Sequence, residues 1–213
     1  MRSFLALPVV AAALFAVGCG EKSDTVTTKG TQSLSLMLDY YPNADHVGIY
    51  DAQSEGDFTR AGLKVAIQQP GDTTSPLKLL AAGKVDLAIS YEPELLLARD
   101  KGERLVAVGA VVQKPLTSII AIGSKHIKTP ADLKGKRVGT AGIPYQDAFL
   151  KMILAKAHVP ESSVKTTAVG FKLVPTMVSG RVDATLGGYW NVEKIQLEQI
   201  GRASCRERVF ITV

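Results

Sequence analysis

The sequence predicts an α/β protein built from two lobes, and two observations carry that prediction. From residue 34 onward, short apolar runs alternate with amphipathic segments, a pattern typical of βαβ units and parallel sheets. In addition, the string Gly-Lys-Val-Asp at 83–86 has a near-copy, Gly-Arg-Val-Asp, 97 positions later at 180–183. That spacing is too long for a solenoid repeat and suits two small α/β units.

Each copy of this repeat combines a helix-ending Gly, a basic residue and a short apolar strand with aromatic and acidic residues at the strand's end. Tyr91 and Glu92 follow the first copy, and Tyr189, Trp190 and Glu193 follow the second. Ligands of open parallel sheets bind beyond the carboxyl ends of the strands, so the pair predicts one ligand site between the lobes. Either copy alone would indicate only an ordinary βα unit with a polar loop.

In the first lobe the pattern predicts strands at 34–38, 63–68, 85–89 and 105–112. The third of these is apolar enough for burial on both faces, as in parallel sheets. Three helices are expected in this lobe. One opens at 46–53 and is broken by 56–62. The second has Ser75 as its cap, Pro76 at its first position and Gly83 at its end. The third begins at Pro93 and ends at Gly102, with Leu95, Leu96 and Ala98 inside.

In the second lobe we expect strands at 119–122, 136–140, 164–169 and 182–186, with helices at 147–157 and 173–179. Thr129 and Asp132 have the spacing of a capping box. The Gly-containing loop 141–145 precedes a helix and can offer free N–H groups to an anion, although most such loops are simple turns. The predicted organisation is 34–116 for the first part of lobe one, 117–187 for lobe two, and 188–199 for a second hinge crossing that starts the return to lobe one.

The N-terminal residues 1–18 read as a secretory signal peptide, because Arg2 precedes an apolar run that is too short to span a bilayer. The junction at 16–20 resembles a bacterial lipoprotein signal in which Cys19 carries the lipid, with Ala16 where Leu is usual. Residues 19–33 are then a flexible tether. The expected location is the extracytoplasmic face of the cell envelope, with the lipid as the only membrane contact. The alternative is a plain secreted protein cut near Gly18.

Residues 200–213 are predicted to be a non-native tail, because their sequence resembles the in-frame translation of a short-read sequencing adapter. A native Arg-rich tail is the alternative. Arg2 and this tail account for three of the five net positive charges, so residues 19–199 carry +2 and no nucleic-acid partner is expected. Cys19 belongs to the anchor and Cys205 to the tail, and three scattered histidines lack ligand spacing, so we expect neither disulfide nor metal site.

Five segments together resemble the thiamine-pyrimidine-precursor (ThiY-like) substrate-binding proteins of ABC transporters. They lie at 38–46, 56–63, 82–86, 132–136 and 188–193, and the resemblance spans about residues 34–199. It implies a two-lobed periplasmic-binding-protein type II fold that closes on an aminopyrimidine, of formylaminopyrimidine or hydroxymethylpyrimidine type, with an ABC transporter permease as partner. It also implies that the chain returns to lobe one after the second repeat copy. Most of that return is missing from this sequence.

The same superfamily contains a rival class, a fungal synthase that builds the pyrimidine from pyridoxal phosphate and a histidine of its own chain. Aligned on 83–86, its cofactor Lys and sacrificial His fall on Ser90 and Glu94 here. Ser cannot form a Schiff base, and Glu has no imidazole to give up. The sequence therefore favours a binding protein, with no cofactor, over an enzyme.

A flat aminopyrimidine needs aromatic faces, hydrogen-bond acceptors for its amino group, and polar contacts to its substituent. Stacking candidates are Tyr41, Tyr91, Tyr189 and Trp190; carboxylate candidates are Asp39, Glu92 and Glu193; substituent candidates are Asn43, His46 and Asn191. Trp190 can instead pack at the hinge, Glu92 can serve the helix macrodipole, and His46 can be satisfied by backbone. Asp86 and Asp183, at strand starts opposite the site, are interpreted as structural.

The ligand itself is left open by the residues. Riboflavin and the nitrate, sulfonate and taurine class have binders of related architecture. A buried anion needs a cation or several N–H donors, and the aromatic and acidic loops carry no Arg, which argues against a sulfonate.

Overall fold

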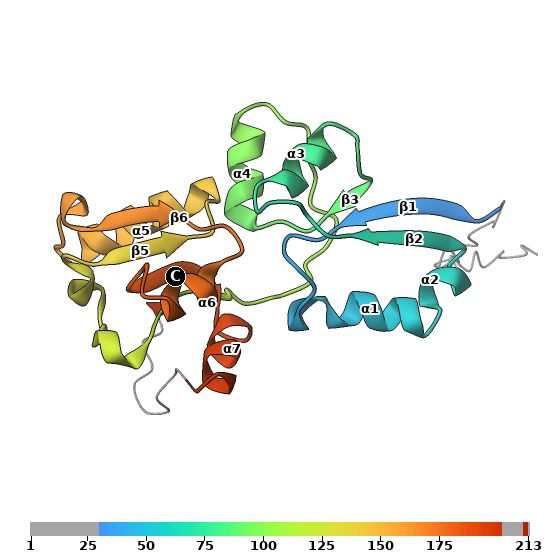
Figure 1. Ribbon diagram of the computed structural model, residues 1–213. Helices are drawn as coiled ribbons and strands as arrows, with labels where there is room; N and C mark the ends of the chain where they lie inside the picture. The colour runs from blue at the N-terminus through green and yellow to red at the C-terminus, as the bar shows by residue number, and fades with distance from the viewer. Residues whose placement is uncertain (1–29, 202–210, 213) are drawn as a thin grey trace, which may run out of the picture.

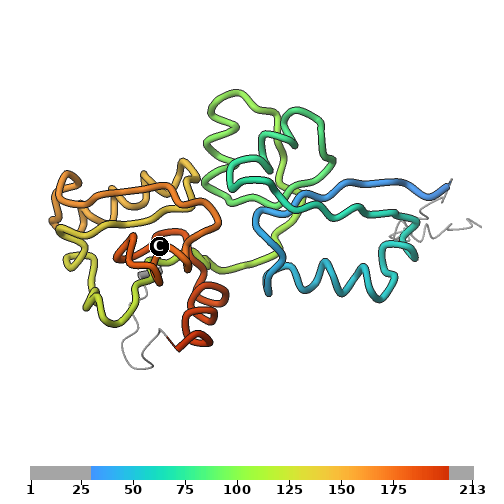
Figure 2. Tube along the Cα trace, in the orientation of Figure 1, coloured from blue at the N-terminus to red at the C-terminus, as the bar shows by residue number. Residues whose placement is uncertain are grey.

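The computed structural model describes residues 30–201 and 211–212 and shows two α/β lobes side by side (Figure 1). Lobe one contains a three-stranded parallel sheet in the order β2-β1-β3. Lobe two contains a five-stranded sheet in the order β6-β5-β7-β4-β8. An extended segment after α4 carries the chain from lobe one to lobe two, as the tube in Figure 2 shows.

Lobe one consists of β1 (Gln32–Met37), η1 (Ala44–His46), α1 (Val47–Ser54), α2 (Asp57–Arg60), β2 (Leu63–Gln68), α3 (Ser75–Ala81), β3 (Leu87–Ala88) and α4 (Glu92–Asp100). β1 pairs with β2 along its whole length, whereas only two residues of β3 pair with β1. In Figure 1, α3 and α4 lie on one side of this sheet and α1 and α2 on the other. Side chains along β2 alternate between half-buried and exposed, as the sequence pattern predicts.

Several local predictions for lobe one are wrong. The predicted break at 56–62 contains the short helix α2, and Ser75 is the first residue of α3 rather than its cap. Leu96, predicted inside α4, is exposed. Residues 105–112 form no strand: Leu105 is buried, but Val108 is 83% exposed. An apolar run becomes a strand only where another strand supplies its hydrogen bonds, and 105–112 pairs with no described strand.

Lobe two consists of β4 (Thr117–Ala121), η2 (Gly123–Lys125), η3 (Pro130–Leu133), β5 (Arg137–Thr140), α5 (Pro144–Lys156), η4 (Glu161–Ser163), β6 (Lys165–Ala168), α6 (Leu173–Val178), β7 (Ala184–Tyr189), α7 (Glu193–Gln199) and β8 (Ile211–Thr212). The predicted capping box of Thr129 and Asp132 is present. α5 begins at Pro144, three residues earlier than predicted, because Pro suits the first helical turn. β4 runs antiparallel to β7, unlike the parallel pairs of β5 with β6 and β7.

The sheet of lobe two is covered on both faces. Leu150 and Leu154 of α5 pack with Leu186 in one buried cluster. On the other face, Met177 of α6 and Leu197 of α7 pack in a second cluster. α7 therefore belongs to lobe two by packing, although it also reaches Tyr41 of lobe one. The residues at the end of β7 therefore extend from a sheet that is packed on both faces.

Asp86 and Asp183 have structural roles, as predicted. The Asp86 carboxylate accepts from the backbone N and the hydroxyl of Ser35, both at 2.7 Å. The Asp183 carboxylate accepts from the backbone N and Nε of Arg137, both at 3.0 Å, and pairs with Lys125 at 2.9 Å. Asp86 thus fastens the start of β3 to the middle of β1, and Asp183 fastens the start of β7 to the start of β5. This leaves the opposite strand ends for the ligand site.

Candidate ligand-binding site

A buried carboxylate lies where the two lobes meet. Asp39 follows β1, and its Oδ2 accepts a hydrogen bond from the Tyr91 hydroxyl at 2.6 Å and one from the Tyr189 hydroxyl at 3.4 Å. His46 Nε2 lies 2.8 Å from Oδ1. Tyr91 ends the lobe-one copy of the repeat and Tyr189 ends the lobe-two copy. The structure therefore brings together four predicted site residues, here called the Asp39 cluster: Asp39, His46, Tyr91 and Tyr189.

A β-bulge in β7 brings the second tyrosine into this cluster. Thr117 pairs with Tyr189 and Ile119 pairs with Leu186, but Gly187 has no partner on β4. Gly187 has φ of 103°, which Gly adopts without strain. Tyr91 stands eight positions after its repeat Gly, whereas Tyr189 stands nine positions after its own, and the bulge holds the extra residue. Both repeat copies therefore end with a tyrosine hydroxyl on the same carboxylate.

The hydrogen bonds around His46 define its tautomer. The backbone N–H of Asn43 donates to His46 Nδ1 at 3.3 Å, so the ring proton lies on Nε2 and points to Asp39. In turn, the Asn43 side chain accepts from the backbone N of Asp45 at 2.9 Å and closes a capping box around η1. His46 thereby orients Asp39, and Asn43 orients His46.

The environment keeps Asp39 charged and its tyrosine partners protonated. Burial alone disfavours the charged carboxylate, but the hydrogen bonds from His46 and Tyr91 outweigh burial and hold the pKa of Asp39 below its usual value. Burial also raises the pKa of Tyr91 and Tyr189 well above the usual value, and the nearby negative Asp39 adds to this rise. The cluster is thus a carboxylate anion surrounded by hydrogen-bond donors.

Glu193 fastens the end of β7 to the start of α7. Its side chain is almost fully buried at 1% exposure, and its Oε2 accepts from the backbone N of Tyr189 at 2.7 Å. Its Oε1 accepts from the Tyr41 hydroxyl of lobe one at 3.4 Å. Burial raises the pKa of Glu193, although the Tyr189 N–H opposes that rise. Glu193 therefore holds Tyr189 in place and contacts both lobes.

Aromatic rings surround the Asp39 cluster. Tyr40 meets Phe171 edge to face at 4.9 Å between ring centroids and lies 6.3 Å from Tyr189. Tyr145 lies 5.6 Å from Tyr91. Tyr40, Phe171 and Tyr145 are absent from the sequence-based site, although Tyr40 adjoins Asp39 and Tyr145 ends the Gly-containing loop. Offset and edge contacts of this kind suit a flat ring as a ligand.

Two further hydrogen bonds join the lobes outside the cluster. The Asn191 amide donates to Asp45 Oδ1 at 2.5 Å, and the Thr73 hydroxyl donates to the carbonyl oxygen of Ala141 at 2.5 Å. Asn191 therefore contacts η1 of lobe one, and Thr73 contacts the loop ahead of α5. These two hydrogen bonds join the lobes in addition to the contacts of the Asp39 cluster.

Two predicted residues lie elsewhere. Glu92 is exposed at the first residue of α4, where the helix macrodipole favours it, and the carboxylate that the structure places near Asp39 is Glu94. The Ser90 hydroxyl donates to Glu94 at 2.5 Å, and burial, together with the Asp39 charge, raises the pKa of Glu94. Trp190 is 46% exposed, so it is no fully buried stacking partner in this conformation.

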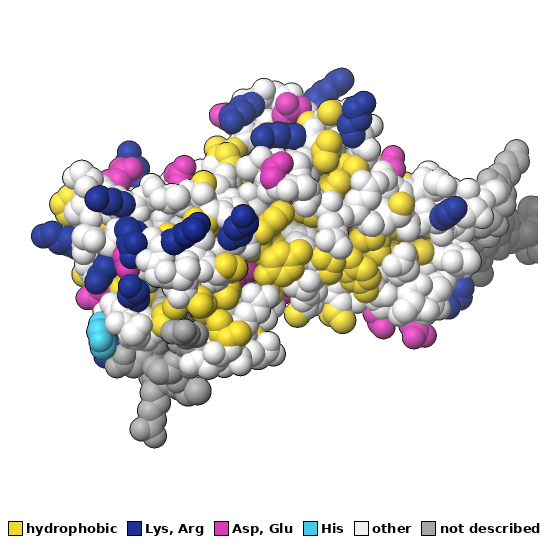
Figure 3. Space-filling model, viewed as in Figure 1, with side chains coloured by type: hydrophobic (Ala, Val, Ile, Leu, Met, Phe, Trp, Pro, Cys, Tyr) yellow, Lys and Arg dark blue, Asp and Glu magenta, His cyan; other side chains and the backbone are white. Residues whose placement is uncertain are grey.

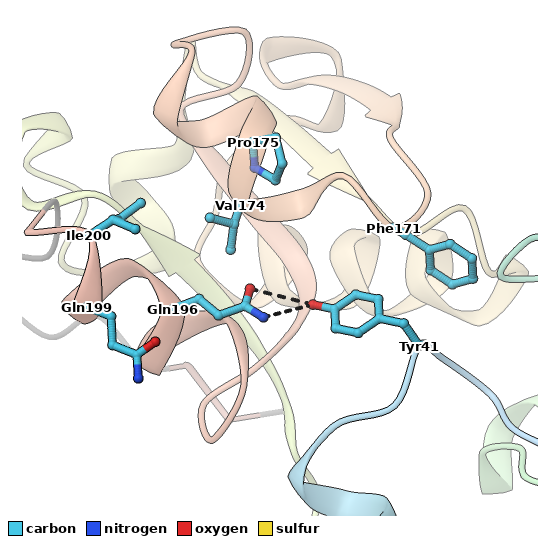
Figure 4. Close-up of a pocket in the computed structure, with 7 residues that line it drawn as sticks. All are labelled: Tyr41, Phe171, Val174, Pro175, Gln196, Gln199 and Ile200. Atoms are coloured by element: carbon cyan, nitrogen blue, oxygen red, sulfur yellow. Dashed lines mark hydrogen bonds between the residues drawn. The ribbon is translucent and has the colours of Figure 1, made fainter. Parts of the chain in front are cut away.

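Beside the cluster, a hollow of about 420 Å³ opens between Tyr41 and the helices α6 and α7 (Figure 4). Its walls are Tyr41, Phe171, Val174, Pro175, Gln196, Gln199 and Ile200. Gln196 donates to the Tyr41 hydroxyl at 3.1 Å across it. Figure 3 shows hydrophobic side chains gathered in the middle of the visible face, where the lobes meet.

Two features are absent from the described part of the chain, a group of metal ligands and a membrane-spanning helix. Across residues 30–201 and 211–212, no group of three or more His, Cys, Asp or Glu side chains is placed to hold a metal ion. Over the same residues, no helix is long and apolar enough to cross a membrane. The predicted lipidation site, Cys19, lies outside the described residues, as does most of the predicted non-native tail.

Comparison with known proteins gives consistent matches. A family model described as "NMT1/THI5 like" matches residues 43–210. A formylaminopyrimidine-binding protein of Halalkalibacterium halodurans is 37% identical over 94% of this chain, and a putative thiamine biosynthesis protein of Haemophilus influenzae is 38% identical over 81%. The chain spans 61% and 55% of the length of these two relatives. More distant relatives include a protein of Legionella pneumophila, 27% identical, named 4-amino-5-hydroxymethyl-2-methylpyrimidine phosphate synthase.

Among solved structures, the alkanesulfonate-binding protein SsuA of Xanthomonas axonopodis pv. citri matches with a TM-score of 0.64. The match covers 81% of this chain and 59% of that one at 20% identity, which shows the fold. The two-lobed α/β fold of periplasmic solute-binding proteins, predicted from the sequence, is therefore confirmed.

Proposed function

The chain belongs to the NMT1/THI5-like family, and on that premise we propose that it is a solute-binding protein that captures a thiamine pyrimidine precursor for an ABC importer. The precursor is of the formylaminopyrimidine or hydroxymethylpyrimidine type. The printed name of the relative from Halalkalibacterium halodurans supports this ligand class. We further propose a binding role rather than an enzymatic one.

One observation carries the proposal: a charged, buried Asp39 that receives a tyrosine hydroxyl from each lobe. A carboxylate accepts strongly from an amino group, and the surrounding rings offer faces to a planar heterocycle. Because Tyr91 and Tyr189 come from different lobes, a ligand at Asp39 contacts both lobes at once. Such a ligand favours the closed arrangement by its differential contacts.

The composition of the site favours an aminopyrimidine over a sulfonate. Asp39, Glu94 and Glu193 are three carboxylates in or beside the cluster, and an anionic ligand would face their charge. A sulfonate needs cations or several N–H donors in their place. Riboflavin, which is larger than a single pyrimidine, is the remaining small-molecule alternative.

The synthase chemistry of more distant relatives receives no support from residues 90 and 94. The Ser90 hydroxyl donates a hydrogen bond to Glu94, and a hydroxyl forms no Schiff base with an aldehyde cofactor. The proposed protein therefore holds its ligand without covalent chemistry.

We also propose that the protein is lipid-anchored at Cys19 on the extracytoplasmic face of the membrane, beside its permease. The support is the short apolar run and the small residues before Cys19. Mass spectrometry of the mature N-terminus from the native host should find an acylated Cys19. An unmodified N-terminus, with release into the medium, would contradict the anchor.

The function is tested by calorimetry of the full-length protein with formylaminopyrimidine, hydroxymethylpyrimidine, riboflavin and taurine. Tight binding of one or both pyrimidines, with no heat from taurine, is the expected result. Binding of taurine or riboflavin alone would overturn the proposal.

A further inference from the structure

Gln146 is a buried polar side chain that the proposed function has not used. It lies in the first turn of α5, is only 1% exposed, and its Oε1 has no hydrogen-bond partner among the described residues. Buried polar groups in folded proteins nearly always have a partner. An acceptor left open at this depth therefore indicates a donor supplied from outside the chain.

The bulge in β7 makes room for this amide. A Cβ on Gly187 would overlap the Gln146 amide nitrogen and lie 2.9 Å from Cδ, so a side chain at this position would displace the Gln146 amide. In the lobe-one copy of the repeat, Ser90 stands at the corresponding position, seven residues after the repeat Gly. The buried amide of Gln146 thus occupies space that is available because residue 187 has no side chain.

This arrangement lies beside the ligand site. Tyr145, the neighbour of Gln146, contacts the Tyr91 ring of the Asp39 cluster, and Gly187 stands two residues before Tyr189. The loop ahead of α5 receives the Thr73 hydroxyl from lobe one through Ala141. Gln146 is therefore held at the end of lobe two that faces lobe one.

The chemistry of an amide complements that of an aminopyrimidine. The ring amino group is a donor directly beside a ring nitrogen acceptor, and a Gln amide presents an acceptor beside a donor. The same bidentate match lets Gln read the donor–acceptor edge of adenine. Carboxylates in the site only accept, so the amide adds the donor that a ring nitrogen needs.

We propose that Gln146 is a specificity-determining residue that hydrogen-bonds the amino edge of the pyrimidine, an inference that rests on the proposed function. The open Oε1 accepts from the ring amino group, and Nε2 donates to the adjacent ring nitrogen. The absence of a side chain at Gly187 leaves the Gln146 amide in the position that the structure shows.

The test compares two probes, formylaminopyrimidine and an analogue whose ring amino group is replaced by hydrogen, by calorimetry of the full-length protein. In the wild type the amino compound should bind at least tenfold more tightly. Gln146→Met keeps the length and removes both hydrogen bonds, so it should lose about tenfold or more on the amino compound and little on the analogue. Gln53→Met, at an exposed position on α1, is the matched control and should discriminate like the wild type.

A second measurement uses the wild-type protein alone. In the wild type, the side-chain amide proton resonances of Gln146 should shift when the amino compound is added and stay in place with the analogue. If the wild type binds the amino compound but Gln146→Met discriminates equally well, or the amide resonances do not respond, the Gln146 proposal is wrong while the proposed function stands. If the wild type binds neither pyrimidine, both fail.

Discussion

The two copies of the Gly-basic-Val-Asp repeat perform the same tasks in very different surroundings. In both, the aspartate ties the strand to its neighbour, and a tyrosine at the far end bonds to Asp39. Yet β7 lies inside a sheet covered on both faces, whereas β3 pairs through two residues at a sheet edge. Leu186 of β7 is 0% exposed, and Leu87 of β3 is 37% exposed.

This difference separates what a local sequence determines from what the rest of the fold determines. The repeat specifies the strand's ends, because its aspartate bonds to the neighbouring strand and its tyrosine bonds to Asp39. Strand length and burial depend on neighbours from distant parts of the chain. Substitutions at corresponding positions of the two copies can therefore measure how much each lobe contributes to stability.

The largest expected difference is in the core. Leu186→Ala should lower the free energy of unfolding by about 2–5 kcal/mol, because it leaves a cavity in a closely packed cluster. Ile89→Ala, at the corresponding position of lobe one, should cost only about 1–2 kcal/mol because Ile89 is half-buried. Denaturant unfolding followed by circular dichroism measures both. Equal losses would show that lobe one is as tightly packed as lobe two.

The second-largest difference is expected at Gly187, the residue that forms the bulge in β7. Gly187→Ala combines a positive φ with an overlap onto Gln146, so we expect a loss of about 1–3 kcal/mol and weaker ligand binding. Ser90→Ala in the other copy removes one hydrogen bond to Glu94 and should cost about 0.5–1.5 kcal/mol. A Gly187→Ala protein with wild-type stability and affinity would contradict the role assigned to the bulge.

A smaller effect is expected at the two aspartates. Asp183→Asn weakens charged hydrogen bonds to Arg137 and the ion pair with Lys125, and burial makes these more valuable than the Ser35 contacts of exposed Asp86. Thermal unfolding should therefore show a drop of a few degrees for Asp183→Asn and a smaller drop for Asp86→Asn. A larger drop for Asp86→Asn would reverse the ranking of the two lobes.

The smallest effect is a pH dependence. The folded-state pKa of Glu94 is raised by burial, so its contribution to stability is present below the usual pKa and is lost as pH rises through the folded value. Asp39 acts in the opposite sense, because its folded-state pKa is lowered and its contribution is lost as pH falls. Glu94→Gln should thus flatten the decline in melting temperature from mildly acidic to neutral pH. An unchanged slope would show that Glu94 does not titrate in this range.

Much of the fold and part of the site follow from sequence alone. Strand and helix alternation predicts most elements of lobe two, and the repeat predicts that Tyr91 and Tyr189 end strands at a common site. Asp39 and His46 follow from the turn after β1. The order of strands and the antiparallel β4 are set by long-range pairing, which no local pattern encodes.

The residues that sequence reasoning missed share one cause: each depends on a contact across the fold. Gln146 stands out only once Gly187 of β7 lies opposite it, and Phe171 only once it meets Tyr40. Glu92 and Glu94 stand two positions apart in one helix turn, and the orientation of α4 places Glu94 inward. The apolar run 105–112 shows the converse, a strong local pattern without a strand partner among the described residues.

The central claim is that Asp39 reads the ligand's amino group between the lobes, with Glu193 holding Tyr189 beside it. Calorimetry of Asp39→Asn with formylaminopyrimidine tests it most directly, since a hydrogen bond to a charged group is worth roughly 1.5–3 kcal/mol. We expect binding at least tenfold weaker than in the wild type, a similar loss for Glu193→Gln, and no change for the control Glu161→Gln on the exposed turn η4. Wild-type affinity in both Asp39→Asn and Glu193→Gln would contradict the claim.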